Sequence, residues 1–342
     1  MPPNDGAQAA QKTGYARAVS PDIGRTAGPT LPQNIFRYIL ATSAAHQAAL
    51  SALTIMVFLL EFVPLELQRR IVNDVVKNRN FRFVVMLCAA YLAVVLIQGG
   101  MKLVLNVYRA WVGERATRDL RLRIRSLVES SPQVLRDSEV SGVEISMIVA
   151  EVEPLGAFAG EAISEPLLQC GVLATVIAYL IHLEPLIALA TIVIFAPQIV
   201  FVPLMQMAIN RSTASRVSVL REVSAEVLEP DDSVGRIRSM DSHIDRVFQL
   251  NIRIFKLKFS MNFLMNLCSH MQIIAALLVG GWFVLTDRLA IGGVVAFISA
   301  IARLNDPWGD LVNYFRDTNL AQVKFRLVAD AIEKLRVPRR SA

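Results

Sequence analysis

The chain has 342 residues, of which 54% are hydrophobic, and its mean hydropathy of +0.46 argues against an ordinary soluble domain. The formal net charge of +6 comes from basic residues spread over several segments, which argues against a nucleic-acid-binding surface. The three cysteines lie in apolar stretches without CxxC spacing, so we expect neither a disulfide framework nor a metal site.

The N-terminal part of the chain predicts a tail followed by a short helix. Residues 1–32 are rich in Ala, Gly, Pro and Thr and contain no apolar run, so we expect a disordered cytoplasmic tail there. Residues 33–45 place four apolar side chains on one helical face, which is typical of an elbow helix lying along the inner membrane surface. Alternatively, these residues form the first turns of the first membrane span.

Six apolar stretches then follow, joined alternately by long and short connections. Each stretch has about the length that crosses a bilayer, which predicts an all-α integral membrane protein with six long transmembrane helices and cytoplasmic extensions. Most Lys and Arg fall on one side of this arrangement, so we expect the plasma (inner) membrane and two cytoplasmic termini. The predicted spans are 47–65, 83–108, 162–182, 184–208, 262–286 and 290–312, before a tail at 336–342.

Several of these helices are predicted to continue far beyond the membrane. No strong helix breaker occurs from Phe83 to about Val128, a stretch of roughly 65 Å at 1.5 Å per residue. Pro197 and Pro203 predict kinks within the fourth span.

The sixth span carries Arg303, Asp306 and Asp310 at helical spacing on one face. Ionisable groups at membrane depth are candidates for a substrate pathway or gate. The alternative is structural, because an Arg303–Asp306 pair at i, i+3 would neutralise itself within the bundle. Pro307 beside this pair predicts a hinge.

Two further polar stripes occur within spans. Asn262, Asn266 and His270 recur at i, i+4 and i+8 in the fifth span, where they either line a polar cavity or bond neighbouring helices. Gln98 and Lys102 lie in the second span, and Lys102 is either part of a cavity or reaches to the inner interface.

Several local motifs occur in a fixed order along this layout. Gly142-Val143-Glu144-Ile145-Ser146 is followed by Glu151-Val152, and a second segment at 226–251 contains Arg236 and Asp241. The last span begins Ile291-Gly292-Gly293-Val294 and continues to Pro307-Trp308 and Arg326. Together with the elbow and the six spans, these motifs make residues 33–335 resemble the transmembrane domain of ABC exporters, the type-1 membrane fold.

The resemblance implies a membrane subunit that forms a translocation pathway and couples to an ATPase. Met147 and Glu151 depart from the residues usual in the first coupling segment. Neither a GxxxxGK[ST] phosphate-binding loop nor an LSGGQ signature occurs, so we expect the ATPase, with its ATP and magnesium, on a separate chain and no cofactor in this one. A homo- or heterodimer in the lipid bilayer is also implied. The residues implied to couple are Gly142, Glu144, Ser146, Glu151, Arg236 and Asp241.

Two alternatives stay open. Some proton-coupled transporters are similar in membrane fold and lack the motor, and Asp306, Asp310 or Glu61 would then carry protons. A motor-less remnant or membrane scaffold is the other alternative.

Overall fold

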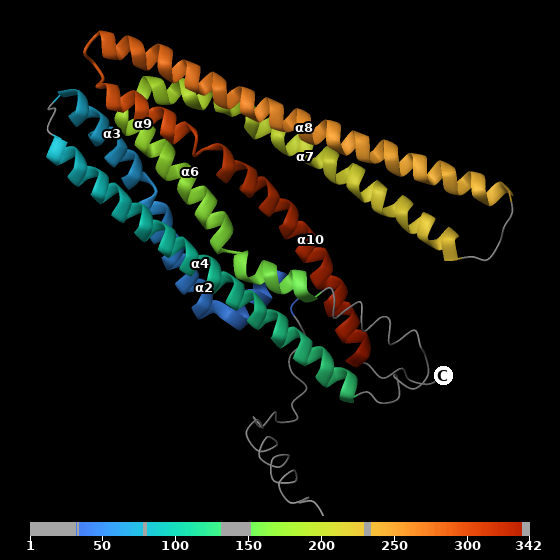
Figure 1. Ribbon diagram of the computed structural model, residues 1–342. Helices are drawn as coiled ribbons and strands as arrows, with labels where there is room; N and C mark the ends of the chain where they lie inside the picture. The colour runs from blue at the N-terminus through green and yellow to red at the C-terminus, as the bar shows by residue number, and fades with distance from the viewer. Residues whose placement is uncertain (1–31, 33, 78–80, 131–151, 229–233, 337–342) are drawn as a thin grey trace, which may run out of the picture. The chain divides into compact units, whose positions relative to one another are not determined.

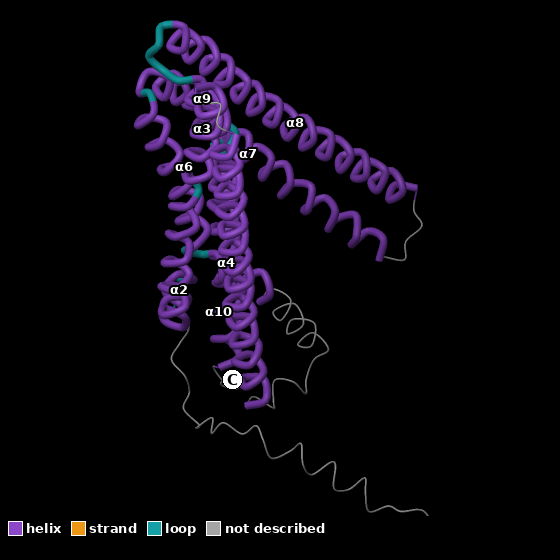
Figure 2. Tube along the Cα trace, turned by 60° about the vertical axis from the view of Figure 1, so that its left-hand side comes forward, coloured by secondary structure: helices purple, strands orange, loops and turns teal. Residues whose placement is uncertain are grey.

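The computed structural model describes residues 32, 34–77, 81–130, 152–228 and 234–336, and these ranges contain helices and turns but no strand (Figures 1 and 2). The chain divides into a unit of residues 1–32, of which only Pro32 is described, and a unit of residues 33–342. Residues 152–161 are helical, and the named helices are α2 (Ile35–Leu60), α3 (Phe62–Lys77), α4 (Phe81–Ser130), α6 (Ser164–Leu183), α7 (Pro185–Leu228), α8 (Val234–Leu285), α9 (Ile291–Ile301) and α10 (Asn305–Arg336).

Five helical segments are long and apolar enough to cross a membrane, which is consistent with a multi-pass membrane protein. They are Ile35–Lys77, Phe81–Ser126, Val152–Leu183, Pro185–Leu220 and Met240–Leu285. The predicted sixth span, 290–312, is divided in the structure between the 11-residue α9 and the start of the more polar α10.

Proline explains where two of the helices break. The ring of a helical proline collides with the carbonyl four residues earlier, where the helix then ends or kinks. For Pro64 that carbonyl belongs to Leu60, the last residue of α2, and for Pro307 it belongs to Arg303, within the turn at 302–304. Each proline lies in the first turn of the following helix, a position that tolerates it. The hinge predicted at Pro307 therefore coincides with an observed break.

The predicted elbow corresponds to the first turns of α2. Asn34 caps the helix by accepting a hydrogen bond from the Phe36 amide at 2.9 Å. The helix is interrupted at Ser43, where φ is −139° and ψ is 27°, close to the predicted boundary between elbow and span. The elbow docks on α10, since the Ile35 amide donates to Gln322 Oε1 at 3.1 Å and the Tyr38 and Phe325 rings lie 5.4 Å apart.

Three helices are much longer than a membrane is thick. α4 is one helix of 50 residues, α8 has 52, and the 44 residues of α7 continue through Pro197 and Pro203 without interruption. α7 and α8 run antiparallel along most of their length, with Gln272 Nε2 donating to the Thr191 carbonyl at 3.1 Å and Arg216 to Asn251 at 3.2 Å. In Figures 1 and 2, the C-terminal half of α7 and the N-terminal half of α8 diverge from α10.

Residues 152–161 pack on α4 through glycines. A side chain at Gly156 would collide with Thr117, and one at Gly160 would collide with the Arg109 carbonyl. Gly156 and Gly160 are four residues apart, the spacing that lets membrane helices approach closely. This contact fixes the backbone around Arg109, while an apolar core between the helices includes Leu50, Leu105, Val176, Ile187 and Phe297.

Candidate functional site

The two helix breaks face each other across the bundle. Arg303, in the turn between α9 and α10, forms an ion pair with the Glu61 carboxylate and donates to the Glu61 carbonyl at 3.1 Å. Glu61 itself lies between α2 and α3. The side chains are 29% and 15% exposed, so the pair is largely removed from solvent. The guanidinium thus contacts both the side chain and the backbone of the α2–α3 junction.

The alternative of an internal Arg303–Asp306 pair is therefore wrong. The turn at 302–304 removes Arg303 from the helical register of α10, so the i, i+3 spacing no longer brings the two side chains together. Asp306 is exposed and makes no ion pair within the described ranges. Arg303 and Asp306 consequently have separate environments.

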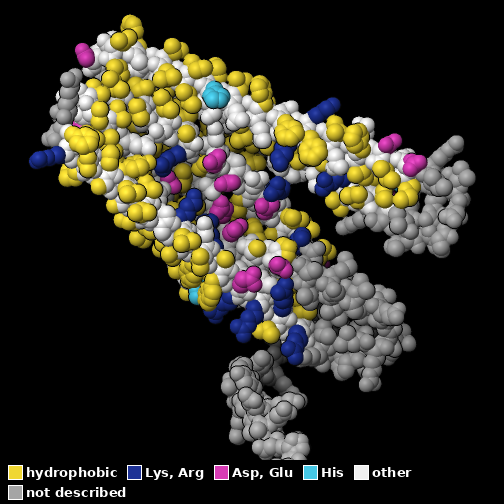
Figure 3. Space-filling view, in the orientation of Figure 1, with side chains coloured by type: hydrophobic (Ala, Val, Ile, Leu, Met, Phe, Trp, Pro, Cys, Tyr) yellow, Lys and Arg dark blue, Asp and Glu magenta, His cyan; other side chains and the backbone are white. Residues whose placement is uncertain are grey.

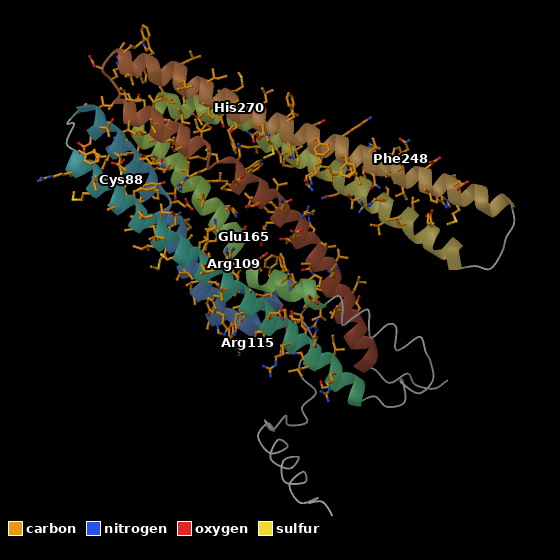
Figure 4. The ribbon with its side chains drawn as sticks, in the orientation of Figure 1. Cys88, Arg109, Arg115, Glu165, Phe248 and His270 are labelled. Atoms are coloured by element: carbon orange, nitrogen blue, oxygen red, sulfur yellow. The ribbon has the colours of Figure 1, made fainter. Side chains whose placement is uncertain are left out.

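A second polar network joins α4, α6 and α10. Arg109 Nη1 lies 2.6 Å from Glu165 Oε2, and Figure 4 shows these two side chains pointing toward each other. Gln169 Nε2 then donates to Glu165 Oε1 at 2.6 Å and to Asp310 Oδ2 at 3.2 Å. The Arg109 side chain is only 7% exposed, and its Nε and Nη2 have no partner in the described part of the chain. The Glu165 carboxylate thus compensates a buried cation.

Charged side chains gather on one face of the molecule. Figure 3 shows Asp and Glu over α6 and α10, with Lys and Arg around them. Lys102 is exposed on α4, and its charge acts on the Asp310 carboxylate. Gln98 is half-buried one turn away. Lys102 and Asp306 thus both lie within electrostatic range of Asp310.

The polar stripe of α8 has a different environment. Asn262, Asn266 and His270 are all exposed, and none makes a hydrogen bond within the described ranges, so they do not bond neighbouring helices of this chain there. Figure 4 shows His270 at the surface of α8. Exposed amides beside Phe263 and Leu267 are unfavourable toward lipid, and they require water or another protein surface.

The implied coupling residues are described only in part. Gly142, Glu144, Ser146 and Glu151 lie outside the described residues. Arg236 lies in α8 with an undescribed side chain, and Asp241 is exposed on the same helix. Their role stays a prediction.

Sequence reasoning missed Arg109, Glu165 and Gln169. Arg109 directly follows the predicted second span and was counted among basic residues outside the membrane, although Glu165 lies inside the predicted third span. An acidic residue at that depth, with a basic residue at the end of a neighbouring span, was the available signal. No group of three or more His, Cys, Asp or Glu side chains in the described ranges could hold a metal ion.

Comparison with known proteins adds no assignment. No protein-family model matches the chain, and no curated protein matches it significantly. Function must therefore be argued from the helices and from these polar networks.

Proposed function

We propose that this chain is the membrane subunit of an ABC-type transporter, forming the substrate pathway and coupling to an ATPase on a separate chain. The observation that carries the proposal is helix length. The 50 residues of α4 and 52 of α8 correspond to about 75–78 Å, more than twice a hydrocarbon core of about 30 Å. Such helices extend far from the membrane, where a motor domain could move them.

The pathway would be lined by the polar side chains that lie at membrane depth on α4, α8 and α10. Charges at that depth are costly unless they are paired or hydrated, and Asp306 has no ion pair in the described structure. The Asn262, Asn266 and His270 stripe would face the same aqueous space or a second membrane subunit. The proposed lining residues are Arg303, Asp306, Asp310, Asn262, Asn266, His270, Gln98 and Lys102.

A single chain would supply half of this pathway. The α7–α8 pair leaves apolar side chains uncovered along its length, among them Phe255, Phe259 and Phe263 on α8. A second subunit, identical or different, would cover part of that surface, with α9 and the start of α10 completing a sixth crossing of the plasma membrane. Both termini would be cytoplasmic.

Coupling would occur through the segments that join the long helices, 131–151 and 229–233, and the adjacent helix ends. Asp241, exposed near the start of α8, is the described side chain best placed to contact an ATPase. ATP and magnesium would bind only to that partner.

The test is gentle solubilisation from the native membrane followed by mass spectrometry. We expect a stoichiometric ATPase with a phosphate-binding loop to copurify, and Asp241→Arg to remove it by placing a cation where the partner meets a carboxylate. Glu114→Arg is the matched control, because Glu114 is exposed on α4 and lies outside both proposed coupling segments. Absence of any ATPase, together with no ATP-driven transport, contradicts the proposal.

The carboxylates support a second candidate, an ATP-independent proton-coupled transporter. Asp306 and Asp310 lie one turn apart on α10, within the predicted sixth span, and both are exposed, so they could exchange protons with a pathway. The test is uptake into proteoliposomes with an imposed proton gradient. We expect Asp306→Asn, Asp310→Asn or Glu61→Gln to abolish gradient-driven uptake if this candidate is correct, and unchanged uptake excludes it.

A further inference from the structure

A hollow of about 110 Å³ lies between the elbow end of α2 and the middle of α4. Its walls include Tyr38, Ser43 and His46 from α2 and Arg115 and Asp119 from α4. Ser43, where the helical geometry of α2 is interrupted, forms part of this wall. Because elbow and span separate at this residue, the hollow is expected at the inner membrane interface.

Arg115 is a cation without a carboxylate partner in the described ranges. Its Nη1 lies 3.3 Å from His46 Nε2, and its Cζ lies 5.4 Å from the centre of the Trp111 ring. An arginine only donates, so His46 Nε2 accepts, and His46 Nδ1 carries the proton that it donates to the Tyr108 hydroxyl at 2.8 Å. The other guanidinium N–H groups are left to bind an external acceptor.

Asp119 lines the same hollow but does not neutralise Arg115. Its Oδ2 accepts from the Tyr38 hydroxyl at 3.2 Å and from Arg123 Nε at 3.0 Å, so its charge is balanced by another cation. An anion at Arg115 therefore meets an uncompensated positive charge with an aromatic ring beneath it.

The surface of α4 next to this hollow changes from apolar to cationic along one stripe. Val104, Val107, Trp111 and Arg115 lie at i, i+3, i+7 and i+11, and all four are exposed. A membrane phospholipid has the same order, from acyl chain through glycerol to phosphate. Tryptophan is also the side chain typical of the membrane–water boundary.

We propose that this surface is a binding site for one anionic phospholipid, whose phosphate binds Arg115 and whose acyl chain lies along Val104, Val107 and Trp111. Inorganic phosphate shares the headgroup chemistry but makes no use of the apolar part of the stripe. The site does not depend on the transport mechanism, since it requires only that α2 and α4 lie in a membrane.

The test uses the fluorescence of Trp111 as the reporter. The chain has three tryptophans, so Trp282→Phe with Trp308→Phe leaves Trp111 alone. We expect phosphatidylglycerol with brominated acyl chains to quench Trp111 with about fivefold higher relative affinity than brominated phosphatidylcholine, the effect of one basic residue at the membrane surface. Arg115→Gln should bring the two lipids close to equal.

Arg211→Gln is the matched control, because Arg211 is exposed on α7 just beyond the predicted span 184–208 and does not line the hollow. It should retain the preference. Equal quenching by both lipids in the parent, or a preference that survives Arg115→Gln, overturns the proposal. Reversal of quenching by inorganic phosphate, at matched ionic strength, assigns the site to free phosphate and overturns the lipid assignment.

A second measurement protects the test against misfolding of the single-tryptophan protein. In detergent, phosphatidylglycerol should raise the thermal unfolding midpoint of the unmodified chain more than phosphatidylcholine does. Arg115→Gln should lose this difference and Arg211→Gln should keep it. A difference between the two lipids that survives Arg115→Gln contradicts the lipid site.

Discussion

The Arg303 guanidinium binds the carboxylate and the carbonyl of Glu61, joining two helix breaks that are 242 residues apart in the sequence. Broken helices in membranes are tolerated where other groups satisfy the freed backbone, and they commonly mark sites that move or bind. This ion pair therefore links two of the places where the helices of this bundle are interrupted.

Neutralising either member of this pair should destabilise the protein. We expect Glu61→Gln and Arg303→Gln each to cost about 1–3 kcal/mol in detergent unfolding, because a charged hydrogen-bonded group loses its partner. The double variant should cost less than the sum of the two. Asp306→Asn is the control and should change stability little. If the loss in the double variant equals the sum of the two single losses, Glu61 and Arg303 do not interact.

Removing the carboxylate from Glu165 should be more severe. Glu165→Ala leaves the buried Arg109 cation uncompensated, so we expect a loss of about 3–5 kcal/mol in unfolding free energy. The Arg121–Glu153 pair is exposed, and Glu153→Ala should cost no more than about 1 kcal/mol. Equal losses of unfolding free energy in Glu165→Ala and Glu153→Ala would show that burial does not make the Arg109–Glu165 pair more important for stability than an exposed pair.

The glycine contact beneath Arg109 gives a third prediction. Gly160→Ala should destabilise the protein, because the new methyl group meets the Arg109 carbonyl and must separate residues 152–161 from α4. Gly99→Ala on α4 is the control, since a side chain there has open space and alanine favours helix by about 0.5–1 kcal/mol. Both variants can be compared by thermal unfolding, and a stabilised Gly160→Ala protein would contradict the close approach.

The polar stripe of α8 predicts a pattern of water access. With the three native cysteines replaced, cysteine at Asn262, Asn266 or His270 should react several-fold faster with a membrane-impermeant thiol reagent than cysteine at Phe263 or Leu267. Reaction requires water to form the thiolate, so the rate reports hydration. Equal rates along the helix would place the stripe in lipid or in a dry interface and contradict a pathway there.

The sequence by itself determined the helical class, the long apolar segments and the break beside Pro307. These features depend on local properties, since the hydropathy of a segment decides whether it can cross a membrane and a proline blocks the carbonyl four residues before it. The break at Glu61 does not follow from the predicted first span, 47–65, which runs through Pro64. The same local reasoning predicts that Asp306, Asp310 and Lys102 lie at membrane depth.

Only the tertiary structure decided which charges meet. Arg303 pairs with Glu61 instead of Asp306 because a three-residue turn changed the register, and Arg109 pairs with Glu165 because glycines let residues 152–161 lie against α4. Both pairings depend on how the helices pack against one another. The spacing of residues along a single helix carries no information about that packing.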